Sequence, residues 1–321
     1  MKRFVVLLLL AAVLLHAGEL LRMEDGIDAM GTTFTVIAYD EDQQRLEQGV
    51  GAALAEAERL NQMLSNYSPG SEWSKVNRDA YAKPVPVSEE LFSLLSKCLE
   101  FSRQSQGSFD ITVGPLMKVW GFYRGSGRLP AKTEIAGAMA SVGYQNIVLD
   151  GKTRSVRFRK PNLEIDPGGI GKGYAVDRMI EKLKENGIKS AMISAGASSI
   201  YALGAPPNDT GWTVEIRNPR QWTEAVAEVQ LRDQSLSTSG DYEKFFEVEG
   251  KVYSHIMDPR TGYPAVGMLS VSVIAPLSLT SEAWSKPFFI LGRDWSVKNK
   301  PKGLRVFLCE DKTPTECAWL Q

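Results

Sequence analysis

One histidine, His255, follows the hydrophobic N-terminal segment, and its neighbours make it the first candidate for chemistry. It lies in the polar segment 253–264, where Asp258 and Arg260 follow it within five residues. Imidazole ionises closer to neutral pH than any other unperturbed side chain, so a histidine among polar groups can act as a general base. The alternative is that His255 only hydrogen-bonds the turn.

A glycine-rich segment, residues 164–177 with the sequence EIDPGGIGKGYAVD, is the second candidate. It places a turn between an expected strand and an expected helix, where backbone N–H groups can bind an anion. The segment is not a dinucleotide fingerprint, because no register fits G-x-G-x-x-G, and it is not a P-loop, because glycine follows Lys172. The alternative is a tight turn that needs glycine for its positive φ.

Hydrophobic periodicity in the rest of the chain predicts the elements that must position these residues. Helical spacing predicts helices over residues 46–63, 88–99 and 172–186, the second capped by Ser88. Helices and strands alternate without a regular βαβ rhythm, which indicates an α+β fold, and no linker separates autonomous domains. We expect one large domain with two intimate subdomains and antiparallel sheets flanked by helices. Strands are predicted over residues 32–38, 191–195, 212–216, 225–231, 251–257 and 269–275, the later ones in an antiparallel sheet.

Charge and cysteine usage narrow the class of protein. The 37 basic and 38 acidic residues nearly cancel, which argues against a nucleic-acid partner because phosphate binding needs a basic excess on one face. Cys309 and Cys317 flank a proline-containing turn, so a hairpin would place them opposite each other as a disulfide. Cys98 falls among leucines at helical spacing and is interpreted as an inert core thiol.

The first seventeen residues have the composition of a secretory signal. Lys2 and Arg3 precede an apolar run over residues 4–15, which is shorter than a typical transmembrane helix. We therefore expect residues 1–17 to be a signal peptide and residues 18–321 to be the mature domain, located in a bacterial periplasm. The alternative is an uncleaved segment that anchors the protein in the inner membrane.

Six sequence blocks occur in the same order as in a known family. Besides the glycine-rich and His255 segments they include MGTTF at 30–34, LSNYSPGSE at 64–72, FDITVGPL with WGF at 109–122, and SGDY at 239–242. Essentially the whole mature chain thus resembles the ApbE-like FAD:protein FMN transferases. The resemblance implies an ApbE-like fold and an exported enzyme that splits FAD with Mg²⁺. Such an enzyme attaches FMN by a phosphoester to a threonine of an acceptor flavoprotein, for example a subunit of a membrane redox complex, and releases AMP.

The resemblance also implies roles for particular residues. His255 would act as the base near the acceptor threonine, and Lys172 would face the phosphates together with the N–H groups of Gly171 and Gly173. Asp177 would contact the adenosine, although it could instead form a salt bridge with Arg178 or Lys182. The remaining nucleotide-site candidates are Met30 and Tyr67 beside the flavin ring, with a core aromatic as the alternative for Tyr67, and Asp110, Gly169, Asp258 and Arg260.

The sequence departs from the family pattern at the metal site. Gly171 and two positions of the segment 281–292 match family ligands. At those two positions this sequence has Glu282 where the family has aspartate and Lys286 where the family has threonine. Glutamate can ligate a hard cation, whereas an ammonium has only donors and cannot. Lys286 would then stand in place of Mg²⁺ or pair with Glu282. A second departure, Ala197, replaces a family glycine. The alternative function is therefore a catalytically degenerate member that binds flavin or a partner.

Overall fold

The structure is a computed structural model that describes residues 20–125, 127–196, 198–243 and 245–321. The predicted signal peptide or anchor, residues 1–17, and the departure at Ala197 lie outside these residues. Within the described part of the chain, none of the helices combines the length and apolar character needed to cross a bilayer.

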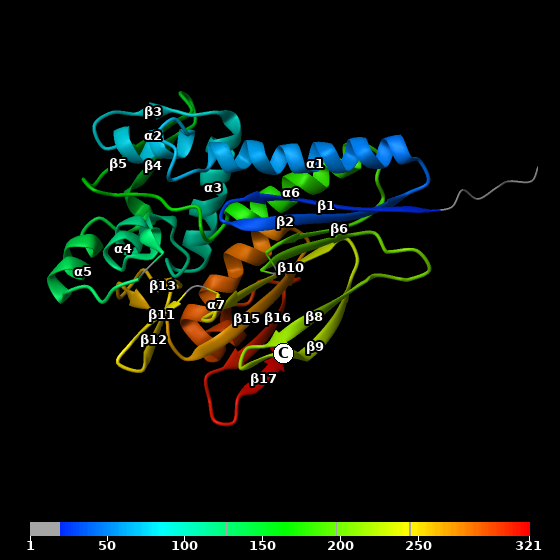
Figure 1. Ribbon diagram of the computed structural model, residues 1–321. Coiled ribbons are helices and arrows are strands. Elements are labelled where there is room, and N and C mark those ends of the chain that lie inside the picture. The colour runs from blue at the N-terminus through cyan, green and yellow to red at the C-terminus, as the bar shows by residue number, and fades with distance from the viewer. Residues whose placement is uncertain (1–19, 126, 197, 244) are drawn as a thin grey trace, which may run out of the picture.

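A large antiparallel sheet of eight strands organises the molecule (Figure 1). Neighbouring strands pair antiparallel throughout, including the first hairpin, in which Ala29 lies opposite Thr32. In spatial order the strands are β1 (Leu21–Ala29), β2 (Thr32–Asp40), β6 (Ser190–Ala195), β7 (Ser199–Leu203), β10 (Gln234–Gly240), β15 (Met268–Ala275), β16 (Arg305–Glu310) and β17 (Glu316–Trp319).

Helices cover one face of this sheet and a β-hairpin covers the other. On β2 the side chains of Phe34, Val36 and Ala38 lie in the core with the helices, whereas Ile37 and Tyr39 pack with the hairpin. This is the two-residue alternation of a strand that is buried on both faces. The helices are α1 (Gln43–Met63), α6 (Gly171–Glu185) and α7 (Ser278–Asn299), and the hairpin is β8 (Trp212–Asn218) with β9 (Gln221–Leu231).

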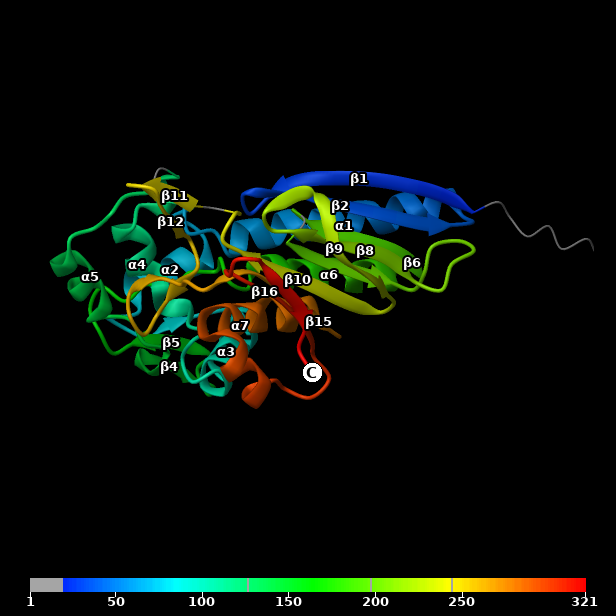
Figure 2. The same cartoon turned by 90° about the horizontal axis from the view of Figure 1, so that it is seen from below.

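The remaining elements gather at one end of the large sheet, as both views show (Figure 2). Three short strands form a small sheet there, and two hairpins lie beside it. The helical elements are α2 (Glu72–Asp79), α3 (Glu89–Gln104), η1 (Ile111–Val113), α4 (Gly114–Val119), η2 (Phe122–Arg124), α5 (Lys132–Met139) and η3 (Tyr144–Asn146). The strands are β3 (Val85–Pro86), β4 (Ile147–Asp150), β5 (Ser155–Phe158), β11 (Phe245–Val248), β12 (Lys251–Ser254), β13 (Met257–Asp258) and β14 (Tyr263–Pro264).

The α+β class and the three predicted helices are confirmed, and Ser88 caps α3 by accepting a hydrogen bond from the Leu91 N–H at 3.2 Å. The single strand predicted over 251–257 is wrong, because β12 pairs with β11 and β13 pairs with β14. The chain changes partner at His255 and Ile256, which therefore lie between strands. The hairpins β8–β9 and β11–β12 are also separate from the large sheet.

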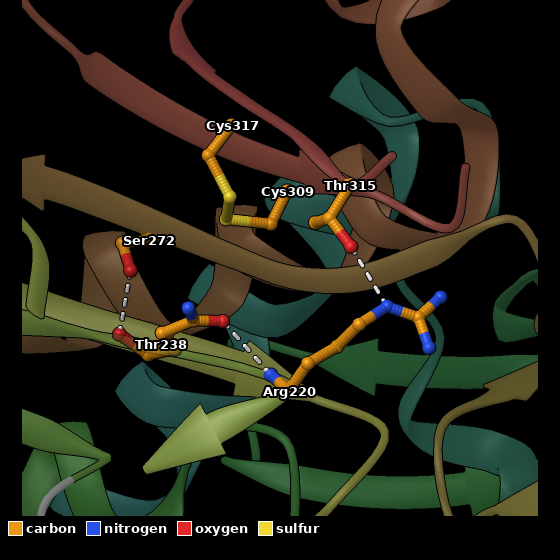
Figure 3. Close-up of a disulfide and its surroundings, with 7 residues drawn as sticks. Arg220, Thr238, Ser272, Cys309, Thr315 and Cys317 are labelled. Carbon is orange, nitrogen blue, oxygen red and sulfur yellow. Dashed lines mark hydrogen bonds between the residues drawn. A yellow bond between two sulfur atoms is a disulfide. The ribbon is translucent and has the colours of Figure 1, made fainter. Parts of the chain in front are cut away.

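Cys309 and Cys317 form the predicted disulfide across the β16–β17 hairpin (Figure 3). The two residues are opposite each other in the register, with their Cα atoms 4.1 Å apart. Arg220, in the β8–β9 turn, donates to the hydroxyl of Thr315 at 2.7 Å and ties that hairpin to the disulfide-bonded one. Cys98 is fully buried in the core, and burial raises the pKa of its thiol, as expected for an unreactive cysteine.

Candidate functional site

Two adjoining cavities bring six of the thirteen candidate residues together: Asp110, Gly169, Lys172, His255, Glu282 and Lys286. Both are lined by Gly168, His255 and Lys286. The larger, of about 90 Å³, is bordered by the first residues of the glycine turn, and the smaller, of about 20 Å³, by polar and charged side chains. A water molecule needs roughly 10–15 Å³ by this kind of measure, so the smaller cavity holds about one water or one polar atom of a ligand. The titratable side chains that line the smaller cavity are Lys172, Glu243, His255, Glu282 and Lys286.

The start of α6 is tied to α7 through a buried carboxylate. The Gly173 N–H donates to Glu282 Oε2 at 2.5 Å, and Glu282 is only 1% exposed. A Cβ on residue 173 would lie 2.5 Å from the Ser278 carbonyl oxygen and 2.8 Å from Glu282 Oε2, so only glycine fits there. Gly171 donates to the Pro167 carbonyl at 2.7 Å. The two N–H groups expected to face phosphates thus already have acceptors within the protein.

Two lysines supply positive charge to the smaller cavity. Lys172 donates to the Ser198 hydroxyl and lies 4.0 Å from Glu243 Oε2. Lys286 Nζ lies 3.8 Å from Glu282 Oε1, and its side chain is 20% exposed. Burial lowers the pKa of Lys286, and Lys172 lowers it further, while Glu282 and Glu243 oppose that shift. Each ammonium therefore has a carboxylate counter-ion within 4 Å.

His255 reaches the same place from the break between β12 and β13. Its ring meets the Phe122 ring edge-on, with centroids 6.5 Å apart, and it lines both cavities. The two predicted catalytic residues, His255 and Lys172, thus border one cavity although 83 positions separate them in the chain. This position suits a group that exchanges a proton with a ligand bound at the glycine turn.

Two buried carboxylates hold the wall of the larger cavity. Asp166 accepts from the Gly168 N–H at 2.8 Å, from Asn66 at 2.9 Å and from the Tyr123 hydroxyl at 2.6 Å. Asp110 accepts from the Tyr144 N–H at 2.7 Å and from Thr112, and burial raises the pKa of the Asp110 carboxyl. Asp110, a predicted site residue, therefore belongs to this wall.

Sequence reasoning did not single out Asp166, Ser198 or Glu243 as site residues. Asp166 stands inside the glycine-rich segment, and Glu243 directly follows the SGDY block. Their proximity to those motifs in the sequence is the feature that could have identified Asp166 and Glu243 as site residues. Their side-chain direction becomes evident only once the strands and α6 are assembled.

Met30 and Tyr67, both predicted beside the flavin ring, line neither of the two cavities. Tyr67 is 75% exposed and meets the Tyr123 ring edge-on at 6.2 Å, which contradicts the alternative of a core aromatic. The Met30 N–H donates to Asn61 at 2.9 Å in the β1–β2 turn. The Met30 sulfur is 3.7 Å from where a Cβ on Gly171 would stand. Met30 instead lines a separate pocket at the β1–β2 turn, and Tyr67 contacts Tyr123, whose hydroxyl donates to Asp166.

Asp177 caps the start of α7 and does not form a salt bridge with a basic side chain. Its two carboxylate oxygens accept from the Ser278 N–H at 2.7 Å and the Leu279 N–H at 2.9 Å. The alternative of a salt bridge with Arg178 or Lys182 is wrong, because those side chains pair with other acids. Burial raises the pKa of Asp177 to about 6. The carboxylate therefore fixes the start of the helix that carries Glu282 and Lys286.

Asp177→Ala is expected to lower the free energy of unfolding by about 1–2 kcal/mol, because two N–H groups at the α7 start lose their acceptor. Chemical denaturation measures this loss. Ser88→Ala, which removes the α3 cap away from the site, is the matched control and is expected to cost about 1 kcal/mol. Parent-like stability in Asp177→Ala would contradict the capping role.

Asp258 and Arg260 form their own local structure in the turn after His255. The guanidinium of Arg260 contacts both carboxylate oxygens of Asp258, at 2.9 and 2.7 Å. The Asp258 carbonyl accepts from the Gly262 N–H at 2.9 Å, and the Gly262 carbonyl accepts from the Trp120 indole at 2.9 Å. These contacts hold the turn that follows the histidine.

The residues at the predicted metal site do not fit a divalent cation. Among the described residues no group of three or more His, Cys, Asp or Glu side chains could hold a metal ion. Glu282 Oε1 is buried without a hydrogen-bond partner in the described part of the chain, but the Lys286 ammonium lies 3.8 Å away. Unit charges 4 Å apart repel by about 4 kcal/mol at an effective dielectric constant of about 20, and a divalent ion doubles that. Gly171 offers only its backbone carbonyl.

Comparison with known proteins identifies relatives of this chain. The ApbE family model matches residues 30–308. An FAD:protein FMN transferase of Klebsiella pneumoniae (strain 342) is 31% identical over 288 residues, which cover 87% of this chain and 81% of the relative. The crystal structure of the ApbE protein of Thermotoga maritima superposes with a TM-score of 0.85 at 31% identity, covering 93% of this chain and 96% of the other. The apo flavinyl transferase ApbE of Pseudomonas stutzeri gives 0.83 at 28% identity, covering 94% and 95%. The chain is therefore a member of the ApbE family, whose fold it shares along most of its length.

Proposed function

We propose that this protein is an exported FAD:protein FMN transferase. The observation that carries the proposal is that His255, Lys172 and Gly168 of the glycine turn border the same cavity, the smaller of the two. Phosphoryl transfer requires positive charge along the phosphates, a positioned nucleophile and an acceptor for its proton, and these residues supply the first and the last. The curated relatives are described as carrying out this reaction.

In the proposed reaction a threonine hydroxyl of the acceptor protein attacks the phosphorus on the FMN side of FAD. An O–P bond forms to the threonine, the P–O bond to the AMP phosphate breaks, and AMP leaves. The hydroxyl proton passes to the imidazole of His255 and then to solvent. Lys172, whose ammonium also contacts Ser198, neutralises charge on the diphosphate.

Export and the nature of the acceptor extend this proposal. The composition of residues 2–17 supports a secretory signal or an inner-membrane anchor. The acceptor would then be a flavoprotein exposed to the periplasm, for example a subunit of a membrane redox complex. Cell fractionation of the full-length protein tests the location, and recovery in the cytosol would contradict it.

The function is tested with purified protein, FAD and the apo form of a flavoprotein subunit that normally carries FMN on threonine. Quenching of flavin fluorescence measures FAD binding, chromatography measures AMP, and intact mass spectrometry detects the FMN adduct. We expect stoichiometric adduct and AMP, and neither with a Thr→Val acceptor. Absence of FAD binding at high micromolar concentration would overturn the proposal.

A second candidate function is flavin binding without turnover. The unsuitable donor set around Glu282 and Lys286 favours it, because the departures fall at the positions that would hold Mg²⁺. The same experiment separates the two functions. A flavin-binding protein quenches FAD fluorescence but forms neither AMP nor adduct under any metal condition.

A further inference from the structure

Lys286 lies at the junction of the two cavities, next to the glycine turn. Its side chain lines both cavities, and its Cε is 3.9 Å from where a Cβ on Gly169 would stand. Glu282, one helical turn earlier on α7, lies 3.8 Å from its ammonium. A ligand phosphate oxygen that enters the junction of the two cavities would therefore meet this ammonium group.

The neighbouring carboxylates oppose the cost of burying the Lys286 ammonium. A half-buried ammonium is costly unless an opposite charge compensates it. Glu282 is fixed by the Gly173 N–H through one oxygen and presents the other to Lys286. Glu243 Oε2 lies 4.0 Å from the Lys172 ammonium, and both residues line the smaller cavity. Each ammonium group thus lies beside one carboxylate of the protein, and a bound diphosphate would share the ammonium groups with these carboxylates.

We propose that Lys286 replaces the divalent cation in this protein. Its ammonium and that of Lys172 donate hydrogen bonds to the diphosphate of the flavin nucleotide, so that nucleotide binding and FMN transfer proceed without a metal. This inference rests on the proposed function. It states that Lys172 and Lys286 supply the positive charge that the transfer reaction requires. In the transfer step Lys286 donates to a phosphate oxygen while the P–O bond to AMP breaks, and no proton moves from it.

Binding of Mn²⁺, followed by electron paramagnetic resonance, tests the inference without relying on activity. With FAD present we expect the parent protein to leave the free Mn²⁺ signal at the level of FAD alone. The double variant Glu282→Asp/Lys286→Thr is expected to remove about one Mn²⁺ per chain. A parent protein that binds Mn²⁺ as the double variant does would overturn the inference. It would also be overturned if neither protein bound Mn²⁺, because Lys286 would then not be what excludes the cation.

A second measurement follows FAD affinity and FMN transfer in EDTA and in Mg²⁺. The parent is expected to show the same affinity and rate, within about two-fold, in both. Lys286→Met keeps the length of the side chain but removes its charge, and is expected to weaken FAD binding at least ten-fold, with no recovery in Mg²⁺. Lys286→Arg should retain most of the affinity. Lys298→Met, an exposed lysine near the end of the same helix, is the matched control and should behave as the parent.

The two measurements distinguish this inference from the proposed function. Parent-like FAD affinity in Lys286→Met, or parent transfer that requires Mg²⁺, would overturn the lysine assignment alone. A parent protein that does not bind FAD would contradict the proposed function itself. Thermal melting of each variant checks that it is folded under the conditions in which its FAD binding and FMN transfer are compared with those of the parent.

Discussion

His255→Ala is expected to lower the rate of FMN transfer by about 10²–10⁴-fold while FAD affinity stays within a few-fold of the parent. A general base acts on the proton of the nucleophile, so its removal raises the barrier of the transfer step more than it weakens ground-state binding. The position of His255 on the shared wall of the two cavities supports this role. Single-turnover transfer with excess protein measures the chemical step.

If His255 only stabilised the turn, its removal would have a different experimental effect. A residue that only holds the turn would change thermal stability and FAD affinity together. We expect His255→Ala to keep a parent-like melting temperature and to recover part of its activity with added imidazole. Equal transfer rates in mutant and parent would assign His255 to the turn.

Gly173→Ala is expected to lower the free energy of unfolding by about 1–3 kcal/mol and to weaken FAD binding. The added methyl group would lie 2.5 Å from the Ser278 carbonyl oxygen, so α6 and α7 must move apart. That movement lengthens the hydrogen bond from the Gly173 N–H to Glu282 and displaces Lys286 on the same helix. Denaturant unfolding and flavin titration measure the two effects.

Gly51→Ala is the matched control, because Gly51 also lies inside a helix but has open space around its missing Cβ. Alanine is favoured over glycine in a helix interior by about 1 kcal/mol, so this variant is expected to be more stable than the parent. If Gly173→Ala lowers and Gly51→Ala raises the free energy of unfolding, the contact of residue 173 with α7 is the cause of the destabilisation. A stabilising Gly173→Ala would contradict the close approach of α6 and α7.

Local patterns were sufficient for much of the fold. The apolar residues of α1 and α3 repeat with the period of a helix, and Ser88 is a favourable N-cap, so these helices follow from short windows of sequence. Cys309 and Cys317 were predictable as a pair because a hairpin turn separates them by eight positions. His255 was recognisable because no other histidine follows the N-terminal segment.

Predictions from the same local patterns were wrong where the pairing partner is distant in the sequence. The segment 251–257 has the composition of one strand, but β11 and β14 pair with its two parts and leave His255 between them. Asp177 has bases nearby in its own helix, yet its carboxylate accepts from Ser278, 101 positions away. Side-chain composition indicates that a residue will be buried or paired, but it does not identify the partner.

The sequence by itself determined the family, the α+β class, the main helices and the identity of the candidate base. Only the tertiary structure decided that Glu282 holds the Gly173 N–H, that Lys286 faces Glu282 and the glycine turn, and that His255 borders the cavity of Lys172. Propensity and periodicity act over a few neighbouring residues and can be read from a window. A site is assembled from contacts between elements far apart in the chain, and its charge balance depends on distances that exist only after α6 and α7 have packed.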